Sequence, residues 1–138
     1  MIRTLGIAAV AAFTLAACSQ SADDKFSADC AILVTDPEAQ ENIVDMNSDS
    51  EGFCACMVQL TNAKPDEEKA LIQSTLAIVA AKMEETGEGA EEVVGPMMTE
   101  AMAQPDNKEM QAVTEGIQKV GRLIDDIEDA FEGGTCPA

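Results

Sequence analysis

Two cysteines separated by one residue, in Cys54-Ala55-Cys56, are the side chains of this sequence best suited to chemistry. A thiolate attacks disulfides, so two thiols this close could exchange disulfides with a substrate. Redox pairs, however, usually have two intervening residues and begin a helix within a βαβ unit, and the sequence has no βαβ pattern. A thiol–disulfide protein that uses Cys54 and Cys56 is therefore an alternative hypothesis.

Two other stretches could bind cations. Oxygen-bearing side chains alternate from Asp45 to Asp49, as in the first half of an EF-hand calcium loop. The match then fails, because Ser50 replaces the loop's glycine and Cys56 replaces its bidentate glutamate. Thioethers at positions 97, 98 and 102 could bind Cu(I), although methionine is also an ordinary filler of helical cores. A protein that binds a divalent cation or Cu(I) is the second alternative.

The sequence contains no His, Trp or Tyr. The missing histidine removes Ser-His-Asp and Cys-His nucleophile systems, histidine metal sites and c-type haem attachment. Adjacent acidic residues such as Glu67-Glu68 diverge by about 100° on a helix, so they do not form a facing carboxylate pair. We therefore predict a non-catalytic protein with no catalytic residues, no bound metal and no cofactor.

The first 17 residues have the three parts of an export signal. Arg3 is positive, residues 5–15 form an uncharged apolar run, and Ala16 and Ala17 follow. The run is shorter than the roughly 20 residues that span a bilayer. We therefore expect residues 1–17 to be a cleaved signal peptide.

The end of this leader, Leu15-Ala16-Ala17-Cys18, resembles the lipobox of bacterial lipoproteins. The resemblance covers only residues 1–18. It implies that Cys18 receives a diacylglyceryl group, that the chain is cut before it, and that the new amino group is acylated. It also implies a bacterial cell-envelope protein held by membrane lipid. Ser19, rather than Asp, after the cysteine implies sorting to the outer membrane, facing the periplasm. Two or three acyl chains hold a protein firmly.

Four cysteines remain if Cys18 carries lipid: Cys30, Cys54, Cys56 and Cys136. An even number in an exported protein predicts two disulfides. Residues two apart on a helix point about 200° away from each other, so Cys54 and Cys56 do not bond together. Each is expected to pair with Cys30 or Cys136, and both arrangements stay open. A four-thiolate metal site is the competing use, but these spacings lack paired C-x-x-C knuckles.

Apolar residues recur at helical spacing nearly everywhere, with no run of period-two alternation. Ser48 with Glu51, and Asp106 with Glu109, have capping-box spacing. Gly95-Pro96 predicts a break or kink, with the main helix beginning at Pro96. The longest helix is expected to bury one regular seam of apolar residues: Val113, Ile117, Val120, Ile124, Ile127 and Phe131.

The fold class that follows is all-α: a small disulfide-stapled bundle of about four to five helices. Residues 18–25 are small and polar, which predicts a lipidated flexible tether. We expect residues 26–138 to form a single helical domain.

The charge of the chain excludes one class of partner. The sequence has 26 acidic and 8 basic residues, a net charge of −18, and loses one more basic residue with Arg3. Such a surface repels phosphate backbones and favours cations or a basic partner, so we exclude nucleic acid. The main hypothesis is a membrane-anchored envelope protein with a binding or structural role, whose partner is an envelope protein that the sequence does not identify.

Overall fold

The structure, a computed structural model, describes residues 20–134 and 136. This part of the chain contains six helices and no strand, which confirms the all-α bundle and corrects the expected count of four to five helices. The helices are α1 (Ala22–Leu33), α2 (Pro37–Asp45), α3 (Ser50–Asn62), α4 (Asp66–Thr86), α5 (Ala90–Ala103) and α6 (Lys108–Glu132). Within the described range, no helix combines the length and apolar character needed to cross a membrane.

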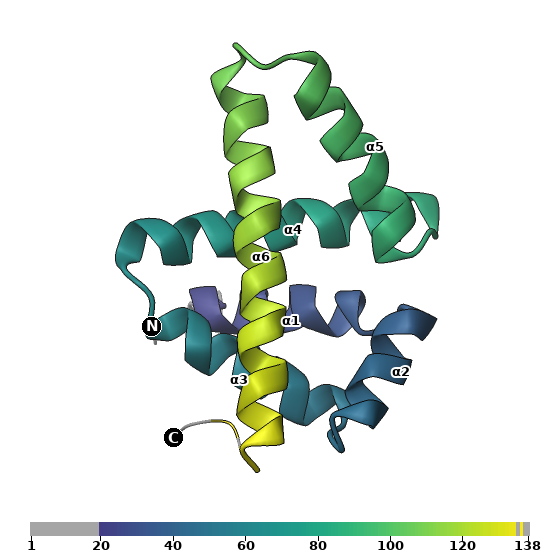
Figure 1. Ribbon diagram of the computed structural model, residues 1–138, viewed down its shortest axis with the longest axis vertical. Coiled ribbons are helices and arrows are strands. Elements are labelled where there is room, and N and C mark those ends of the chain that lie inside the picture. Colours follow the sequence, from purple (N-terminus) through teal and green to yellow (C-terminus); the bar gives the residue numbers. More distant parts are fainter. Residues whose placement is uncertain (1–19, 135, 137–138) are drawn as a thin grey trace, which may run out of the picture.

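Helix α6 crosses the rest of the bundle. In Figure 1 it runs from top to bottom in front of α4 and α1, with α3 behind its lower half and α5 and α2 on its right. Helix α1 contacts both α3 and α4, and α6 contacts α3, α4 and α5. The largest fully buried apolar side chains come from the helices that cross there: Phe26, Met57, Ile72, Leu76, Leu123 and Ile127.

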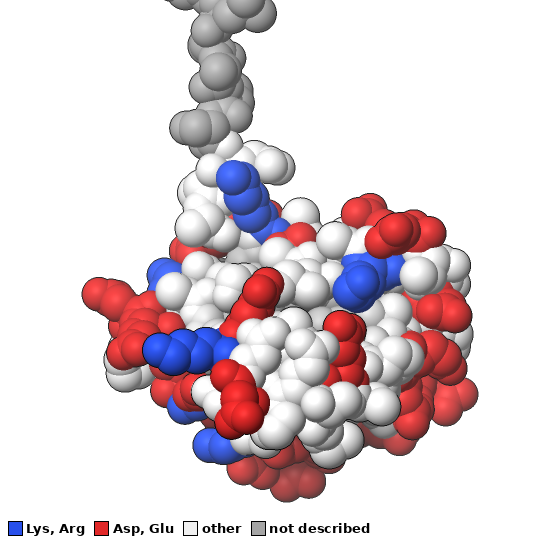
Figure 2. Space-filling view, turned by 90° about the horizontal axis from the view of Figure 1, so that it is seen from above, with Lys and Arg blue, Asp and Glu red and all other residues white. Residues whose placement is uncertain are grey.

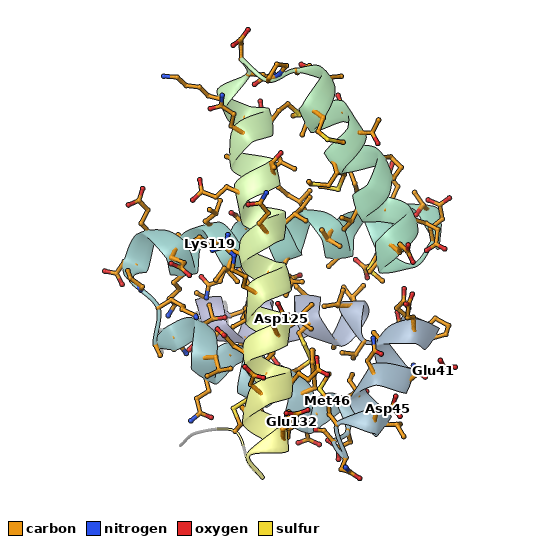
Figure 3. All side chains as sticks on the ribbon, viewed as in Figure 1. Glu41, Asp45, Met46, Lys119, Asp125 and Glu132 are labelled. Atoms are coloured by element: carbon orange, nitrogen blue, oxygen red, sulfur yellow. A yellow bond between two sulfur atoms is a disulfide. The ribbon has the colours of Figure 1, made fainter. Side chains whose placement is uncertain are left out.

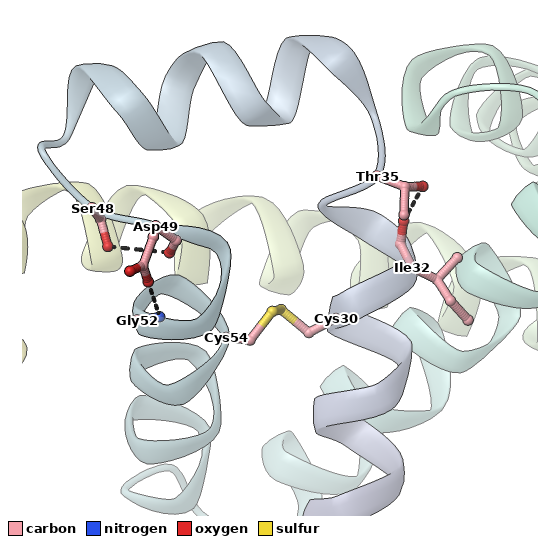
Figure 4. The surroundings of a disulfide bond; sticks show 7 residues. All are labelled: Cys30, Ile32, Thr35, Ser48, Asp49, Gly52 and Cys54. Carbon is pink, nitrogen blue, oxygen red and sulfur yellow. Dashed lines mark hydrogen bonds between the residues drawn. A yellow bond between two sulfur atoms is a disulfide. The ribbon is translucent and has the colours of Figure 1, made fainter.

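Local sequence explains where several helices begin and end. Ser21 and Asp24 form a capping box, so α1 starts at Ala22 and takes up residues 22–25, which the sequence suggested as tether. Asp49, rather than Ser48, caps α3 by accepting a hydrogen bond from the amide of Gly52 at 2.7 Å. The hydroxyl of Ser48 instead donates to the Asp49 carbonyl (Figure 4).

Two boundaries in the second half of the chain also differ from expectation. Asn107, rather than Asp106, caps α6, because its side chain accepts from the amide of Glu109 at 3.0 Å. Helix α5 begins at Ala90 and continues through Gly95-Pro96, so the start of a main helix predicted at Pro96 is wrong. Pro96 lies in the second turn, where its missing N–H removes only the hydrogen bond to the carbonyl four residues earlier.

Two disulfides tie both ends of the described chain to α3. Cys30 of α1 bonds to Cys54 (Figure 4), and Cys56 bonds to Cys136, beyond the end of α6. This is one of the two arrangements that the sequence left open. Cys30, Cys54 and Cys56 are buried, and Cys136 is half-buried. The disulfides are therefore part of the core.

Helices α4 and α6 approach closely at a glycine. A Cβ placed on Gly116 of α6 would lie 1.9 Å from the hydroxyl oxygen of Thr75 on α4, which is itself buried. Only a residue without a side chain permits this contact. A second glycine of the same helix, Gly121, would meet no atom within 4 Å.

The two glycines give a matched test of the helix crossing. We expect Gly116→Ala to destabilise the fold by about 2 kcal/mol, because the added methyl forces α4 and α6 apart. Gly121→Ala should stabilise it by about 1 kcal/mol, because alanine is the better helix former and nothing obstructs it. Urea unfolding followed by circular dichroism measures both values. Changes of the same sign would contradict the close contact at Thr75.

The disulfides are expected to differ in their contributions to stability. The Cys56–Cys136 bond joins residues 80 apart in sequence and the Cys30–Cys54 bond joins residues 24 apart. Chain-entropy arguments give about 4.5 kcal/mol for the longer loop and about 3.5 kcal/mol for the shorter one. Replacing both cysteines of each pair with serine, and measuring urea unfolding, tests the order. A larger loss for the Cys30–Cys54 pair would contradict it.

Candidate binding groove

The cysteines suggested as a redox pair are separated by the fold. Cys54 and Cys56 leave α3 in different directions and bond to different partners, in the core of the bundle. A thiol–disulfide role stays a prediction for which the structure supplies no exposed pair among the cysteines that it describes. Cys18, the expected lipidation site, lies outside the described residues.

The Asp45–Asp49 stretch forms the junction between α2 and α3. Asn47 adopts a left-handed conformation with φ of 55°, and the amides of Asn47 and Ser48 donate to the carbonyls of Val44 and Ile43. This is a Schellman arrangement, which satisfies the last carbonyls of a helix. Asp49 then caps α3. The residues that carry the alternating oxygen atoms thus end α2 and begin α3.

The methionines of α5 do not share one environment. Met97 and Met98 are half-buried, whereas Met102 is 68% exposed. More generally, the residues that the structure describes include no group of three or more His, Cys, Asp or Glu side chains placed to hold a metal ion.

The feature that stands out instead is a groove along one side of α6. It consists of three connected hollows, called upper, central and lower after their places in Figure 1. The upper hollow, about 160 Å³, lies where α4, α5 and α6 meet, and the central one, about 330 Å³, lies between α2, α6 and the start of α5. The lower one, about 220 Å³, lies between α2 and the second half of α6.

The hollows adjoin one another, because they share lining residues. Leu33, Ala90 and Ile124 line both the upper and the central hollow. Asn42, Met46 and Ile124 line both the central and the lower hollow. The α6 residues that border the groove run from Ile117 to Glu132, a length of about 22 Å at 1.5 Å per residue.

The floor of the upper and central hollows is apolar. Leu76 and Val79 of α4 line the upper hollow, and Ile43 and Phe53 line the central hollow; all four are buried core residues. Above them, the half-exposed side chains that remain open to solvent are also apolar: Val94, Ile117, Val120 and Ile124. A pocket of apolar character with a few polar groups at its edge is the usual form of a binding site.

The edges of the groove are acidic. Glu38 and Glu91 border the central hollow, and Asp45, Glu128 and Glu132 border the lower one. No Lys or Arg of the described chain lines any of the three hollows. Figure 3 shows Asp45 and Met46 on α2 and Glu132 on α6 at the lower end, with Lys119 on the other side of α6.

Two basic side chains near α6 form ion pairs outside the groove. Lys119 pairs with Glu68 of α4 at 3.0 Å, and Lys64 pairs with Asp126 at 2.8 Å. Seen from the end of the bundle in Figure 2, the surface carries many more acidic than basic side chains around neutral areas. The electrostatic field at the groove is therefore negative.

The carboxylate of Asp36 joins the starts of α2 and α5, two of the helices that line the groove. An oxygen of Asp36 accepts from the amides of Glu38 at 2.8 Å and Ala39 at 3.3 Å, which caps α2. The other oxygen accepts from the amide of Ala90 at 2.7 Å, at the start of α5 and 54 residues away. Helix α5 has no cap from its own Gly89, so Asp36 supplies it. A Cβ on Gly89 would lie 2.4 Å from the Asp36 carboxylate.

The environment of Asp36 favours its charged form. Burial, at 8% exposure, would raise the pKa of this carboxyl. Hydrogen bonds from the amides of Ala90, Ala39 and Glu38 outweigh burial, so the pKa is lowered from its ordinary value. Asp29 shows the opposite balance, because burial and the nearby charge of Glu84 raise its pKa.

Parts of the groove follow from local sequence, but the groove itself does not. Asp36 before Pro37 has the pattern of a helix cap, whereas its hydrogen bond to Ala90 joins distant parts of the chain. In the apolar seam that the longest helix was expected to bury, Ile127 is buried, whereas Ile117, Val120 and Ile124 are half-buried and line the upper hollow. The available signal was an apolar stripe wider than one neighbouring helix can cover.

Asp36→Asn is expected to release α5 from α2. The amide oxygen can still cap α2, but the NH₂ group would face the Ala90 amide, leaving two donors opposed, at a loss of about 2 kcal/mol at neutral pH. The control Asp49→Asn should change stability by only a few tenths of a kcal/mol, because Asn caps one helix as well as Asp does. Denaturant unfolding gives both values, and hydrogen exchange at Ala90 localises the loss. Equal losses would contradict the double cap.

Acid should remove the contribution of Asp36. Because its pKa is lowered in the fold, the stabilisation is present above the unfolded pKa of about 3.9 and is lost as pH falls through the folded value. The pKa of Asp29 is raised in the fold, so the free energy of unfolding falls as pH rises and this carboxyl ionises. Asp29→Asn should therefore stabilise the fold at pH 7. Unfolding of both Asn variants at pH 7 and at pH 2.5 checks these signs. An Asp36→Asn defect that persists undiminished in acid would count against the ionised cap.

Comparison with protein-family models, with curated proteins and with solved structures finds no match for this chain. A function must therefore be inferred from the groove itself: an apolar floor, acidic edges and two walls joined by a single carboxylate.

Proposed function

We propose that this protein is a lipid-anchored protein of the bacterial cell envelope with a non-catalytic binding role. The observation that carries the binding role is the groove beside α6, about 22 Å long, in which the apolar side chains of Ile117, Val120 and Ile124 stay half-exposed. Continuous apolar surface of this kind, edged by charge, marks interaction sites on proteins. The location rests on the lipobox resemblance at residues 15–18.

The rigidity of the bundle supports a binding role. Two disulfides fix α1 and Cys136 to α3, so Leu33 of α1 and Phe53 of α3, which line the central hollow, lie on cross-linked helices. Pre-organised surfaces bind more tightly, because less conformational freedom is lost on association. Acylation of Cys18 would place this surface at the membrane, joined to α1 by only a few residues.

The experiment is an intact mass measurement on the protein extracted gently from its host's membranes. We expect the chain to begin at Cys18, to carry the added mass of a diacylglyceryl group there, and to have its other four cysteines paired. Under native conditions we expect a second component to remain bound without a covalent link. The variant Cys18→Ser, produced in the same host, should lack the lipid mass.

The two parts of the proposal fail separately. An unmodified Cys18 would overturn the lipid anchor. A lipidated chain that carries nothing in native spectra, and that forms no cross-links to other proteins in intact cells, would overturn the binding role.

A further inference from the structure

The shape of the groove narrows the kind of ligand that fits it. Its three hollows lie in series along α6 and none exceeds about 330 Å³. A row of shallow hollows suits side chains projecting from a rod, whereas a compact small molecule needs one deep cavity. An α-helix of about 15 residues has the same length as the α6 face from Ile117 to Glu132.

The charge of the groove narrows the kind of ligand further. Six carboxylates, Asp36 among them, line the central and lower hollows, and no Lys or Arg of the described chain lies among them. Anionic lipids and acidic peptides would be repelled, whereas Lys and Arg side chains flanking an apolar stripe would be attracted. The ligand therefore has an apolar face and a basic face.

The wall of the groove has room for a second helix to approach. Gly121 lies at the upper hollow, is exposed, and has no atom within 4 Å of where its Cβ would be. Ile117 and Ile124 lie one turn before and after it on the same side of α6. A partner helix could thus contact the α6 backbone at Gly121 while its apolar side chains enter the hollows on either side.

We propose that the groove binds an amphipathic helix of a partner protein, with its apolar face on α6 and its Lys and Arg side chains against the acidic edges. Anchor residues at i, i+3 or i+4, and i+7 would fill successive hollows, as in other helix-in-groove complexes. This inference rests on the proposed binding role and names its partner chemistry.

The test uses synthetic 15-residue peptides and the full chain with Cys18→Ser, so that no detergent or lipid competes for the groove. One peptide carries Leu on one helical face and Lys on the other, with a single Trp among its apolar anchors. A second has the same composition in an order that scatters Leu around the helix. Because the protein contains no Trp or Tyr, peptide fluorescence is free of background.

Two variants of α6 decide whether binding occurs in the groove. Gly121→Leu places a side chain in the upper hollow and should fold at least as well as the parent, since Leu is a better helix former. Gln118→Leu adds the same side chain at an exposed position that lines none of the three hollows. We expect Gly121→Leu to weaken binding at least tenfold and Gln118→Leu to change it less than twofold.

A second pair of variants tests the acidic edge. Glu128→Gln with Glu132→Gln removes two carboxylates from the lower hollow. Glu85→Gln with Glu115→Gln removes two exposed carboxylates that lie outside the groove. We expect about a threefold or greater loss of affinity for the first pair, with a weaker dependence on salt, and a smaller loss for the second.

Each of the following results would overturn the inference that the groove binds a helix. Equal binding to Gly121→Leu and Gln118→Leu would mean that charge alone holds the peptide elsewhere, as would equal binding of the scattered peptide. Binding of dodecyltrimethylammonium that depends on Gly121, without binding of the peptide, would assign the groove to a small cationic amphiphile. If the peptide fails but native spectra of the extracted protein show a bound component, the proposed function stands and the helix partner does not.

Discussion

Helix α3 is the point to which the rest of the described chain is covalently tied. Its two cysteines stand one residue apart, so the helix directs them to opposite sides. Cys54 holds α1 and Cys56 holds the residue beyond α6, and both bonds lie in the core. The crossing of α1, α4 and α6 is built around this short helix, and the close contact at Gly116 adds to it. These bonds and contacts thus stabilise the core of a chain that has few aromatic residues.

The groove depends on a different kind of restraint. Helix α2 buries only Ile43, so little packing holds it, whereas α5 packs against both α4 and α6. Asp36 joins the first turns of α2 and α5 through its two carboxylate oxygens. Covalent bonds therefore tie α1 and Cys136 to α3, while hydrogen bonds to one ionised side chain hold the start of α2 to the start of α5.

Local patterns in the sequence predicted most of the fold. The helical spacing of apolar residues predicted the all-α bundle, and the helical geometry of Cys54 and Cys56 excluded a bond between them. What could not be predicted was set by contacts between distant segments. The Asp36–Ala90 hydrogen bond and the Gly116–Thr75 approach both depend on how helices cross. The groove is a product of the same crossings, since Ile117 and Ile124 follow a pattern that suits core and groove equally.

The positions of the disulfides also determine how the molecule would transmit a mechanical load. Tension applied between the two ends of the described chain would follow α1 to Cys30, pass through sulfur to Cys54, and leave α3 through Cys56 for Cys136. The backbone of α2, α4, α5 and α6 lies outside this covalent path. A protein held at its N-terminal end could therefore be pulled from its C-terminal end while the helices that form the groove bear little of the force.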